Sequence, residues 1–257
     1  MDSDKFKKYA TNVLHEIDIF CRKRDIKYFI CYGTLIGAIR HGGFIPWDDD
    51  IDIVMPREDY EKFLRTFNTE RYKIASYETD KKYPYMFAKV YDSYTSLDED
   101  YMKPYKIGVF VDVFPMDNWV GTKEYKKLCK LVLLFKARQM KFSKFFSFKT
   151  NCTNFIYKCI SYTIPKNTLY KMINKRISNA KESNTLAVQV EAIDKCILFD
   201  KEIFKGYETT IIPFENIEVL APANYDDILK SVYGDYMKLP PESEQVSNHA
   251  FTVKYND

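Results

Sequence analysis

Several features are scarce or missing in this 257-residue chain, and each absence excludes a class of protein. The six cysteines form no Cys-x-x-Cys pair and the three histidines lie far apart, so we expect reduced thiols and no zinc site. No uninterrupted apolar stretch reaches the ~18 residues of a membrane-spanning helix. The first residues, Met1 to Lys5, are polar, so we expect no secretory signal and a cytoplasmic location.

Acidic residues are scarce in one part of the chain. Residues 122–176 hold 14 lysines and arginines but a single acid, Glu124, which gives a net charge of +13. Because the whole chain carries +3, the remaining residues carry −10. Aromatic residues interleaved with these cations favour contact with an anionic membrane surface, and a helical lobe with a solvated basic face is the alternative. No recognised nucleic-acid-binding motif accompanies the charge, so we expect no nucleic acid partner.

The remaining composition, 46% hydrophobic and 16% aromatic, is sufficient for a full core. Hydrophobic periodicity predicts strands over 28–32, 50–54, 72–76, 85–91 and 107–114. It predicts helices over 3–24, 34–40, from Pro56 to about Phe67, over 122–147, twice within 152–182, and from Pro222 to Gly234, before an extended tail from Lys238. The fold class is therefore α/β, with a core formed by residues 1–121 and 183–257 and an inserted helical basic lobe over 122–182.

A dense cluster of carboxylates indicates a metal site. Asp50 and Asp52 alternate with apolar residues in a predicted strand and therefore share one face. Carboxylates ~7 Å apart along a strand suit one or two Mg²⁺ ions, with Mn²⁺ as an alternative ion. Asp48 is a further candidate ligand, whereas we expect no ligand role for Asp49. A solvated acidic loop and a calcium loop are the alternatives, but Ile53 stands where a calcium loop requires glycine.

A second predicted strand carries a single acid. Asp112 stands in the otherwise apolar run from Gly108 to Pro115, where an unpaired carboxylate is costly to bury. If this strand lies beside the first, Asp112 completes a face of three carboxylates and would orient or deprotonate an attacking hydroxyl group. The alternative is an aspartate at the solvated edge of the strand.

The residues before the carboxylates favour phosphate binding. Gly33 and Thr34 stand between a predicted strand and a predicted helix, where free amides bind anions. Arg40 and His41, at the end of that helix, are candidates either to contact donor phosphates or to cap the helix. Lys89 is a single cation in an aromatic strand, and is a candidate phosphate ligand or a lysine on the solvent face.

Two consecutive motifs carry a family resemblance, Tyr32-Gly33-Thr34-Leu35-Ile36-Gly37-Ala38-Ile39-Arg40-His41 and Phe44-Ile45-Pro46-Trp47-Asp48-Asp49-Asp50-Ile51-Asp52-Ile53. Four later segments agree with it: Lys89-Val90, Val111 to Pro115, Ala221 to Tyr225, and Tyr233 to Met237. The chain resembles LicD-family phosphotransferases, which are related to fukutin-related protein. The similarity covers roughly residues 25–120 and 217–249.

The resemblance implies a nucleotidyltransferase-like fold of the DNA polymerase β superfamily, with a mixed sheet flanked by helices. It implies transfer of phosphocholine, or a similar phosphoalcohol, from a CDP-activated donor such as CDP-choline to a hydroxyl group of a glycan, with release of CMP. The acceptor would be a teichoic acid or lipopolysaccharide precursor, that is, a lipid-linked glycan. Family metal ligands fall on Asp50 and Asp52 with Asp48 adjacent, and Asp112 matches the third carboxylate.

A choline substrate would require an aromatic cage, because its quaternary ammonium donates no ordinary hydrogen bond. Four aromatic residues near the motifs are candidates: Tyr32, Trp47, Tyr85 and Trp119. A lipid-linked acceptor would place the protein at the inner face of the plasma membrane through residues 122–176. Two rival hypotheses remain: a nucleotidyltransferase that moves the nucleotide itself to a small acceptor, and a membrane-associated binding protein without catalysis.

Overall fold

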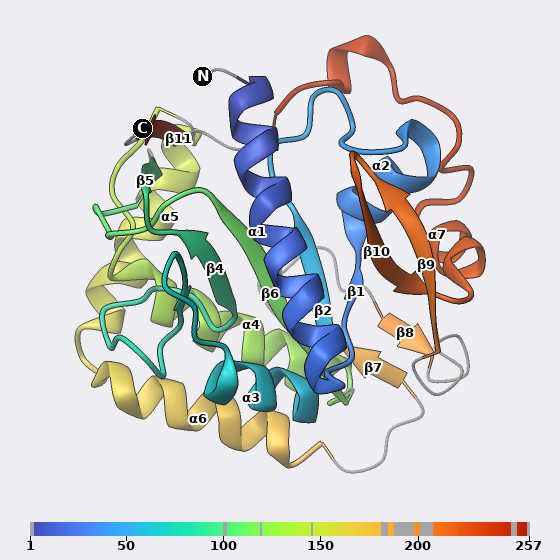
Figure 1. Ribbon diagram of the computed structural model, residues 1–257. Helices are drawn as coiled ribbons and strands as arrows, with labels where there is room; N and C mark the ends of the chain where they lie inside the picture. The colour runs from blue at the N-terminus through green and yellow to red at the C-terminus, as the bar shows by residue number, and fades with distance from the viewer. Residues whose placement is uncertain are drawn as a thin grey trace.

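A computed structural model describes most of the chain (Figure 1). The described residues are 3–99, 102–118, 120–144, 146–180, 185–187, 198–200, 208–247 and 251–255. Trp119 and Cys196 lie outside these ranges. The five described cysteines are free thiols, and Cys21, Cys31 and Cys129 are buried. Among the described helices, none has the length and apolar character needed to cross a bilayer.

A mixed sheet forms the centre of the fold, with strand order β1-β2-β6-β4-β3. These strands are β1 Phe29–Ile30, β2 Asp52–Pro56, β6 Phe110–Asn118, β4 Ala88–Asp92 and β3 Tyr72–Ala75. β2 and β6 run parallel, whereas the other neighbouring pairs along this order run antiparallel. The far end of β6 also pairs with β7 (Thr185–Ala187), which pairs with β8 (Leu198–Asp200). The predicted mixed sheet flanked by helices is confirmed.

Helix α1 (Ser3–Arg24) packs across the sheet against β4 and β6 (Figure 1). Its apolar stripe is fully buried and consists of Phe6, Ala10, Val13, Leu14, Ile17 and Cys21. Side chains alternate between the two faces of a strand, so Ile53, Val111 and Val113 share one face while Asp52 and Asp112 point to the other. One face of the sheet therefore forms the core under α1, and the opposite face is available for polar side chains.

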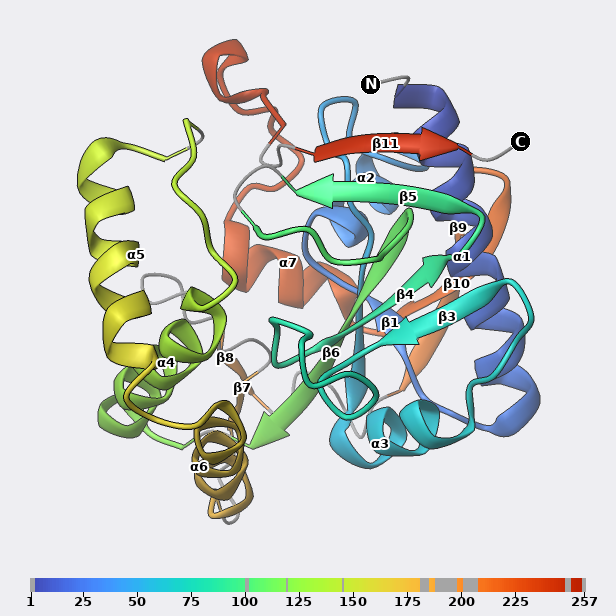
Figure 2. The same ribbon diagram turned by 90° about the vertical axis from the view of Figure 1, so that its left-hand side faces the viewer.

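Three helices of the basic region lie on the other side of the sheet from α1 (Figure 2). They are α4 Thr122–Ala137, α5 Phe148–Ser161 and α6 Lys166–Ser178, and α4 contacts both of the others. Leu128, Val132 and Phe135 of α4 form a small core with Leu169 and Ile173 of α6. The division of the chain at residues 122 and 182 stays a prediction.

The C-terminal part returns to the carboxylate motif. A hairpin of β9 (Thr209–Phe214) and β10 (Ile217–Pro222) precedes α7 (Tyr225–Tyr233). At the hairpin turn, the Glu215 carboxylate accepts a hydrogen bond from the Phe44 amide at 2.9 Å. After the short 3-10 helix Glu242–Glu244, strand β11 (Phe251–Tyr255) pairs with β5 (Thr95–Glu99). The predicted extended tail is thus partly a strand.

Three predicted helices are confirmed, with ends that differ from the prediction by no more than three residues. The helix predicted over 3–24 is α1, the helix predicted from Pro56 is α3 (Arg57–Thr66), and the helix predicted to end at Gly234 is α7. Two boundaries in the motif were predicted wrongly. Strand β1 ends at Ile30 because Tyr32, with a φ of 49°, turns the chain directly into α2 (Tyr32–His41). Gly33 and Thr34 therefore lie in the first turn of that helix. Strand β2 begins only at Asp52, where pairing with Asp112 starts, so Asp50 precedes the strand.

Other boundaries also differ from prediction. The strands predicted over 85–91 and 107–114 begin at Ala88 and Phe110, and strands β5, β9 and β10 were not predicted. The helix predicted over 122–147 ends at Ala137. The chain leaves the helix there because Arg138 donates hydrogen bonds to the carbonyl groups of Ser161 and Ile164, which fixes the reversal into α5. Ser147 caps α5 by accepting a hydrogen bond from the Thr150 amide.

Candidate active site

Three charged residues lie side by side on neighbouring strands. Asp52 of β2 is directly opposite Asp112 of β6, and Asp112 is directly opposite Lys89 of β4. Residues in register on adjacent strands point to the same face of a sheet. The Lys89 ammonium donates a hydrogen bond to Asp112 Oδ1 at 2.7 Å, and both residues are buried. Asp52 and Asp112 of the predicted three-carboxylate face therefore lie side by side, with Lys89 as a buried cation next to Asp112, whereas Asp50 precedes the strand.

Three more carboxylates lie just before β2. Asp48, Asp49 and Asp50 each offer an oxygen, and these oxygens lie within 4.8 Å of one another. Asp49 is buried and accepts a hydrogen bond from the Ser247 hydroxyl group. The sequence reasoning set Asp49 aside, whereas the structure groups it with Asp48 and Asp50. Three consecutive acids at the start of a strand were the feature that could have included it.

Burial and repulsion between carboxylates raise the pKa values of Asp48 and Asp52. The pKa of Asp48 rises to about 7, first because of burial and then because of the neighbouring Asp50 and Asp49. Burial also raises the pKa of Asp52 well above its usual range, with further contributions from Asp50, Asp112 and Asp48. Lys89 offsets part of this increase. Buried oxygen ligands whose charges repel one another fit a hard divalent cation.

The start of α2 is hydrogen-bonded to the backbone of Asp52 and lies against the Asp48 side chain. The Thr34 hydroxyl oxygen accepts a hydrogen bond from the Asp52 amide at 2.8 Å, and the Cys31 amide donates to the Asp52 carbonyl group at 3.0 Å. A side chain on Gly33 would collide with the Asp48 carboxylate. The glycine and threonine of the first motif therefore contact the acids of the second. A phosphate-binding role for Gly33 and Thr34 stays a prediction.

Arg40 and His41 lie at the C-terminal end of α2. Arg40 Nη1 donates a hydrogen bond to the Tyr236 carbonyl oxygen at 2.7 Å, which ties the helix to the segment after α7. His41 is largely exposed, and the partial loss of water around its ring, together with the charge of the neighbouring Arg40, lowers its pKa. Gly42 ends the helix in the left-handed conformation, with a φ of 73°. Contact of Arg40 or His41 with donor phosphates stays a prediction.

Comparison with known proteins decides the family. Residues 25–167 match the family described as LicD/FKTN/FKRP, nucleotidyltransferase domain. The chain belongs to the LicD family. The predicted LicD-like transferase with a nucleotidyltransferase-like fold is thereby confirmed.

Three relatives are similar to the chain, and one of them carries the family's name. The chain is 30% identical, over 259 residues, to the lipopolysaccharide cholinephosphotransferase LicD of Haemophilus influenzae. That similarity covers 93% of this chain and 92% of the relative. An uncharacterised protein of Rickettsia typhi is 47% identical over 55 residues, covering 20% of this chain and 18% of the relative. An uncharacterised protein of Rickettsia prowazekii is 48% identical over 59 residues, covering 22% of each.

An aromatic cavity of about 160 Å³ lies beside Lys89 in this LicD-family chain. The rings of Tyr83 and Tyr85 are 5.6 Å apart, and those of Tyr83 and Tyr105 are 5.5 Å apart. Glu99 also lines the cavity and accepts a hydrogen bond from the Tyr85 hydroxyl group. Glu99 Oε1 is 4.0 Å from Lys89 Nζ. Sequence reasoning named Tyr85 but missed Tyr83, Tyr105 and Glu99.

The candidate cage residues lie in different surroundings. Tyr85 lines the aromatic cavity, whereas Tyr32 lines a smaller cavity between α2 and α7. A row of rings joins the two through Phe114 and Phe87. Trp47 is half-buried and contacts the His41 ring edge-to-face at 6.3 Å. Trp119 lies outside the described residues.

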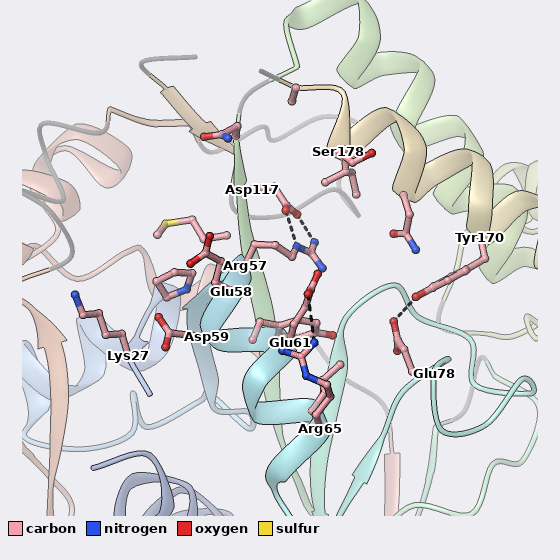
Figure 3. Close-up of a pocket in the computed structure, with 18 of the residues that line it drawn as sticks. Lys27, Arg57, Glu58, Asp59, Glu61, Arg65, Glu78, Asp117, Tyr170 and Ser178 are labelled. Atoms are coloured by element: carbon pink, nitrogen blue, oxygen red, sulfur yellow. Dashed lines mark hydrogen bonds and ion pairs between the residues drawn. The ribbon is translucent and has the colours of Figure 1, made fainter. Parts of the chain in front are cut away.

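A larger cavity, of about 880 Å³, lies at the other end of β2 and β6 (Figure 3). Arg57 and Asp117 form an ion pair in it, with Arg57 Nε 2.7 Å from Asp117 Oδ1. The Tyr170 hydroxyl group of α6 points toward Glu78 across the cavity (Figure 3). The lining residues include none of the predicted site residues. The candidate active site is therefore distinct from this larger cavity.

Proposed function

We propose that this LicD-family protein transfers phosphocholine, or a closely similar phosphoalcohol, from CDP-choline or a related donor to a hydroxyl group of a cell-surface glycan. One observation carries the proposal: strand register sets Asp52 beside Asp112, within electrostatic reach of Asp48 and Asp50. A relative that matches nearly the whole chain is a lipopolysaccharide cholinephosphotransferase, which supports choline phosphate and a lipopolysaccharide-type acceptor. CMP is the expected second product.

The carboxylates fit a divalent metal ion, and we assign Mg²⁺, with Mn²⁺ as the alternative. Asp48, Asp50, Asp52 and Asp112 would supply the oxygen ligands, and Asp49 joins them as a candidate. Their mutual repulsion is the physical reason to expect a cation there. When bound, Mg²⁺ would offset the negative charge that develops on the donor phosphates.

The transfer step itself uses side chains of the protein to accept a proton and to hold the reacting groups. The acceptor oxygen attacks the phosphorus atom that bears choline, and the bond between this phosphorus and the CMP oxygen breaks. The bonding electrons leave with CMP, and the proton of the acceptor hydroxyl group passes to the Asp112 carboxylate. Lys89 fixes the orientation of that carboxylate through its 2.7 Å hydrogen bond. Thr34 holds the Asp52 backbone in place.

We place the choline headgroup in the aromatic cavity beside Lys89. The faces of aromatic rings attract quaternary ammonium groups, and Tyr83, Tyr85 and Tyr105 supply three rings. Glu99 is the single carboxylate among the described lining residues, which also include Lys82, Lys89 and Lys103. At about 160 Å³, the cavity suits a headgroup better than a whole nucleotide. Because Lys89 contacts Asp112 and lies 4.0 Å from Glu99, the cavity is close to the proposed reacting end.

Product analysis tests the reaction. With CDP-choline, Mg²⁺ and a glycan acceptor, we expect CMP and a phosphocholine-modified glycan in equal amounts. Asp52→Asn and Asp112→Asn should each lower kcat by about 10³-fold, because the metal ligand or proton acceptor is lost. The matched control Asp98→Asn changes an exposed aspartate of β5 and should leave kcat unchanged. Pyrophosphate release from CTP, without CMP release from CDP-choline, would favour the rival nucleotidyltransferase.

A donor comparison tests the headgroup site separately. Glu99→Gln keeps the size of the side chain but removes its charge. We expect KM for CDP-choline to rise about 5- to 10-fold, whereas KM for CDP-glycerol, whose alcohol is uncharged, should stay constant. An equal change for both donors would show that the cavity does not bind the choline group.

A further inference from the structure

Helix α5 presents an apolar stripe to the solvent. Phe148, Phe155, Ile156 and Ile160 are 76%, 63%, 57% and 46% exposed. Phe148 and Phe155 are seven residues apart and Ile156 and Ile160 are four apart, so these side chains share one broad face of the helix. Cys159, on the same face, is also exposed. Scattered exposed apolar residues are ordinary on a protein surface. A continuous apolar stripe on one helix instead indicates a surface that binds a membrane or another protein.

The opposite face of α5 is polar and is held inside by hydrogen bonds. Asn151, 4% exposed, donates to the carbonyl oxygens of Ser143 at 2.8 Å and Phe146 at 3.0 Å. The buried Ser161 lies at the other end, where its carbonyl oxygen accepts a hydrogen bond from Arg138 Nε at 3.1 Å. Rotating α5 to bury the apolar stripe would break these hydrogen bonds. The outward orientation of the stripe is therefore fixed by the fold.

The residues around the stripe determine what covers it. Phe142, 67% exposed, extends the stripe from the preceding loop and contacts the Phe148 ring edge-to-face. Lys141, Lys144 and Lys149 are exposed and stand within two residues of Phe142 or Phe148 in the sequence. Glu124 is the single acid among residues 122–176, which hold 14 lysines and arginines. This charge would repel a second copy of the same surface, whereas it complements an anionic lipid headgroup layer.

We propose that the outward face of α5 docks on an anionic bilayer, with Phe148, Phe155 and Ile156 inserted at the level of the headgroups. The neighbouring lysines would then lie among the lipid phosphates. Apolar insertion combined with electrostatic attraction is how interfacial helices bind, and neither term alone suffices for stable binding. The inference concerns where the protein binds and does not depend on the transferred group.

Vesicle sedimentation of the full chain tests the proposal. The protein should sediment with vesicles of phosphatidylcholine plus phosphatidylglycerol but not with phosphatidylcholine alone, and added salt should weaken binding. The double variant F155S/I156S should bind the anionic vesicles about 10-fold more weakly or worse, because less apolar area is inserted. Ile19→Ser is the matched control, since it removes an isoleucine that is 48% exposed on α1.

Three outcomes would overturn the proposal. Equal binding to both vesicle types would exclude the electrostatic part, and unchanged binding of F155S/I156S would exclude insertion of α5. A concentration-dependent dimer without vesicles, abolished by F155S/I156S, would show that a second copy covers the stripe. Thermal unfolding of each variant verifies that it is folded. The variant K144Q/K149Q tests the electrostatic part independently, because it should weaken binding to anionic vesicles while leaving the apolar stripe intact.

Discussion

The ion pair between Lys89 and Asp112 yields the sharpest test of the carboxylate face. Lys89→Met keeps a long side chain but removes the ammonium group 2.7 Å from Asp112 Oδ1. The two side chains are 5% and 11% exposed, so solvent replaces little of the lost interaction. Asp112 would then lie beside Asp52 without its cation.

The expected magnitude follows from burial. Removing one partner of a buried ion pair costs about 3–5 kcal/mol, because an uncompensated charge remains. At the lower limit, about 3 kcal/mol, Tm should fall by about 6–12 °C for a chain of this size. The double variant K89M/D112N retains neither charge, so it should be less destabilised than Lys89→Met alone. The coupling energy should exceed about 1 kcal/mol.

The assay is thermal unfolding of the wild type, both single variants and the double variant, first in EDTA and then with Mg²⁺. If Asp112 and Asp52 bind the ion, Mg²⁺ should restore part of the stability lost in Lys89→Met, because the cation replaces the missing charge. Lys106→Met, which changes an exposed lysine, should alter stability by less than about 0.5 kcal/mol. Single-variant effects that simply add in the double variant would refute the proposed coupling.

Three further predictions concern the same site. Gly33→Ala should displace the Asp48 carboxylate and lower kcat by about 10²-fold with little change in Tm; unchanged kcat would contradict this contact. Thr34→Val should destabilise the fold by about 1–3 kcal/mol in chemical denaturation, because the Asp52 amide loses its acceptor. Thr34→Ser should retain most of that stability, and an equal loss would indicate lost packing instead. Chelation with EDTA should abolish CMP release and added Mg²⁺ should restore it, whereas activity in EDTA would exclude a required metal.

Local patterns predicted the helices well. The stripe of α1 repeats over 22 residues, and Pro56 and Gly234 mark helix ends in the chain itself. Boundaries set by distant partners were not predictable in this way. Strand β5 forms because residues 251–255, far along the chain, pair with it. The end of α4 at Ala137 coincides with Arg138 binding the carbonyl groups of Ser161, the last residue of α5, and of Ile164 beyond it, and no local pattern marks that contact.

The carboxylate site was predicted through its residues and only partly through its geometry. Asp50 was placed on a strand because acids alternate with isoleucines, yet β2 begins at Asp52. Alternation of polar and apolar residues shows which side chains share a face of a strand. It does not show where the strand begins, because that depends on pairing with the neighbouring strand. Asp48, Asp49 and Asp50 instead converge from a loop, where consecutive residues are not forced to opposite faces.

Lys89 shows how the pairing could have been inferred from the chain alone. Asp112 in an apolar strand and Lys89 in an aromatic strand are each costly to bury alone. From the sequence, each residue was treated separately and was given a possible position exposed to solvent. The possibility that the two opposite charges pair with each other was not considered. Burying them as a pair reduces both costs at once, and the structure joins them across 23 residues of sequence. Two unexplained charges of opposite sign in neighbouring core strands are therefore better interpreted together, and that interpretation predicts β4 beside β6 with Lys89 opposite Asp112.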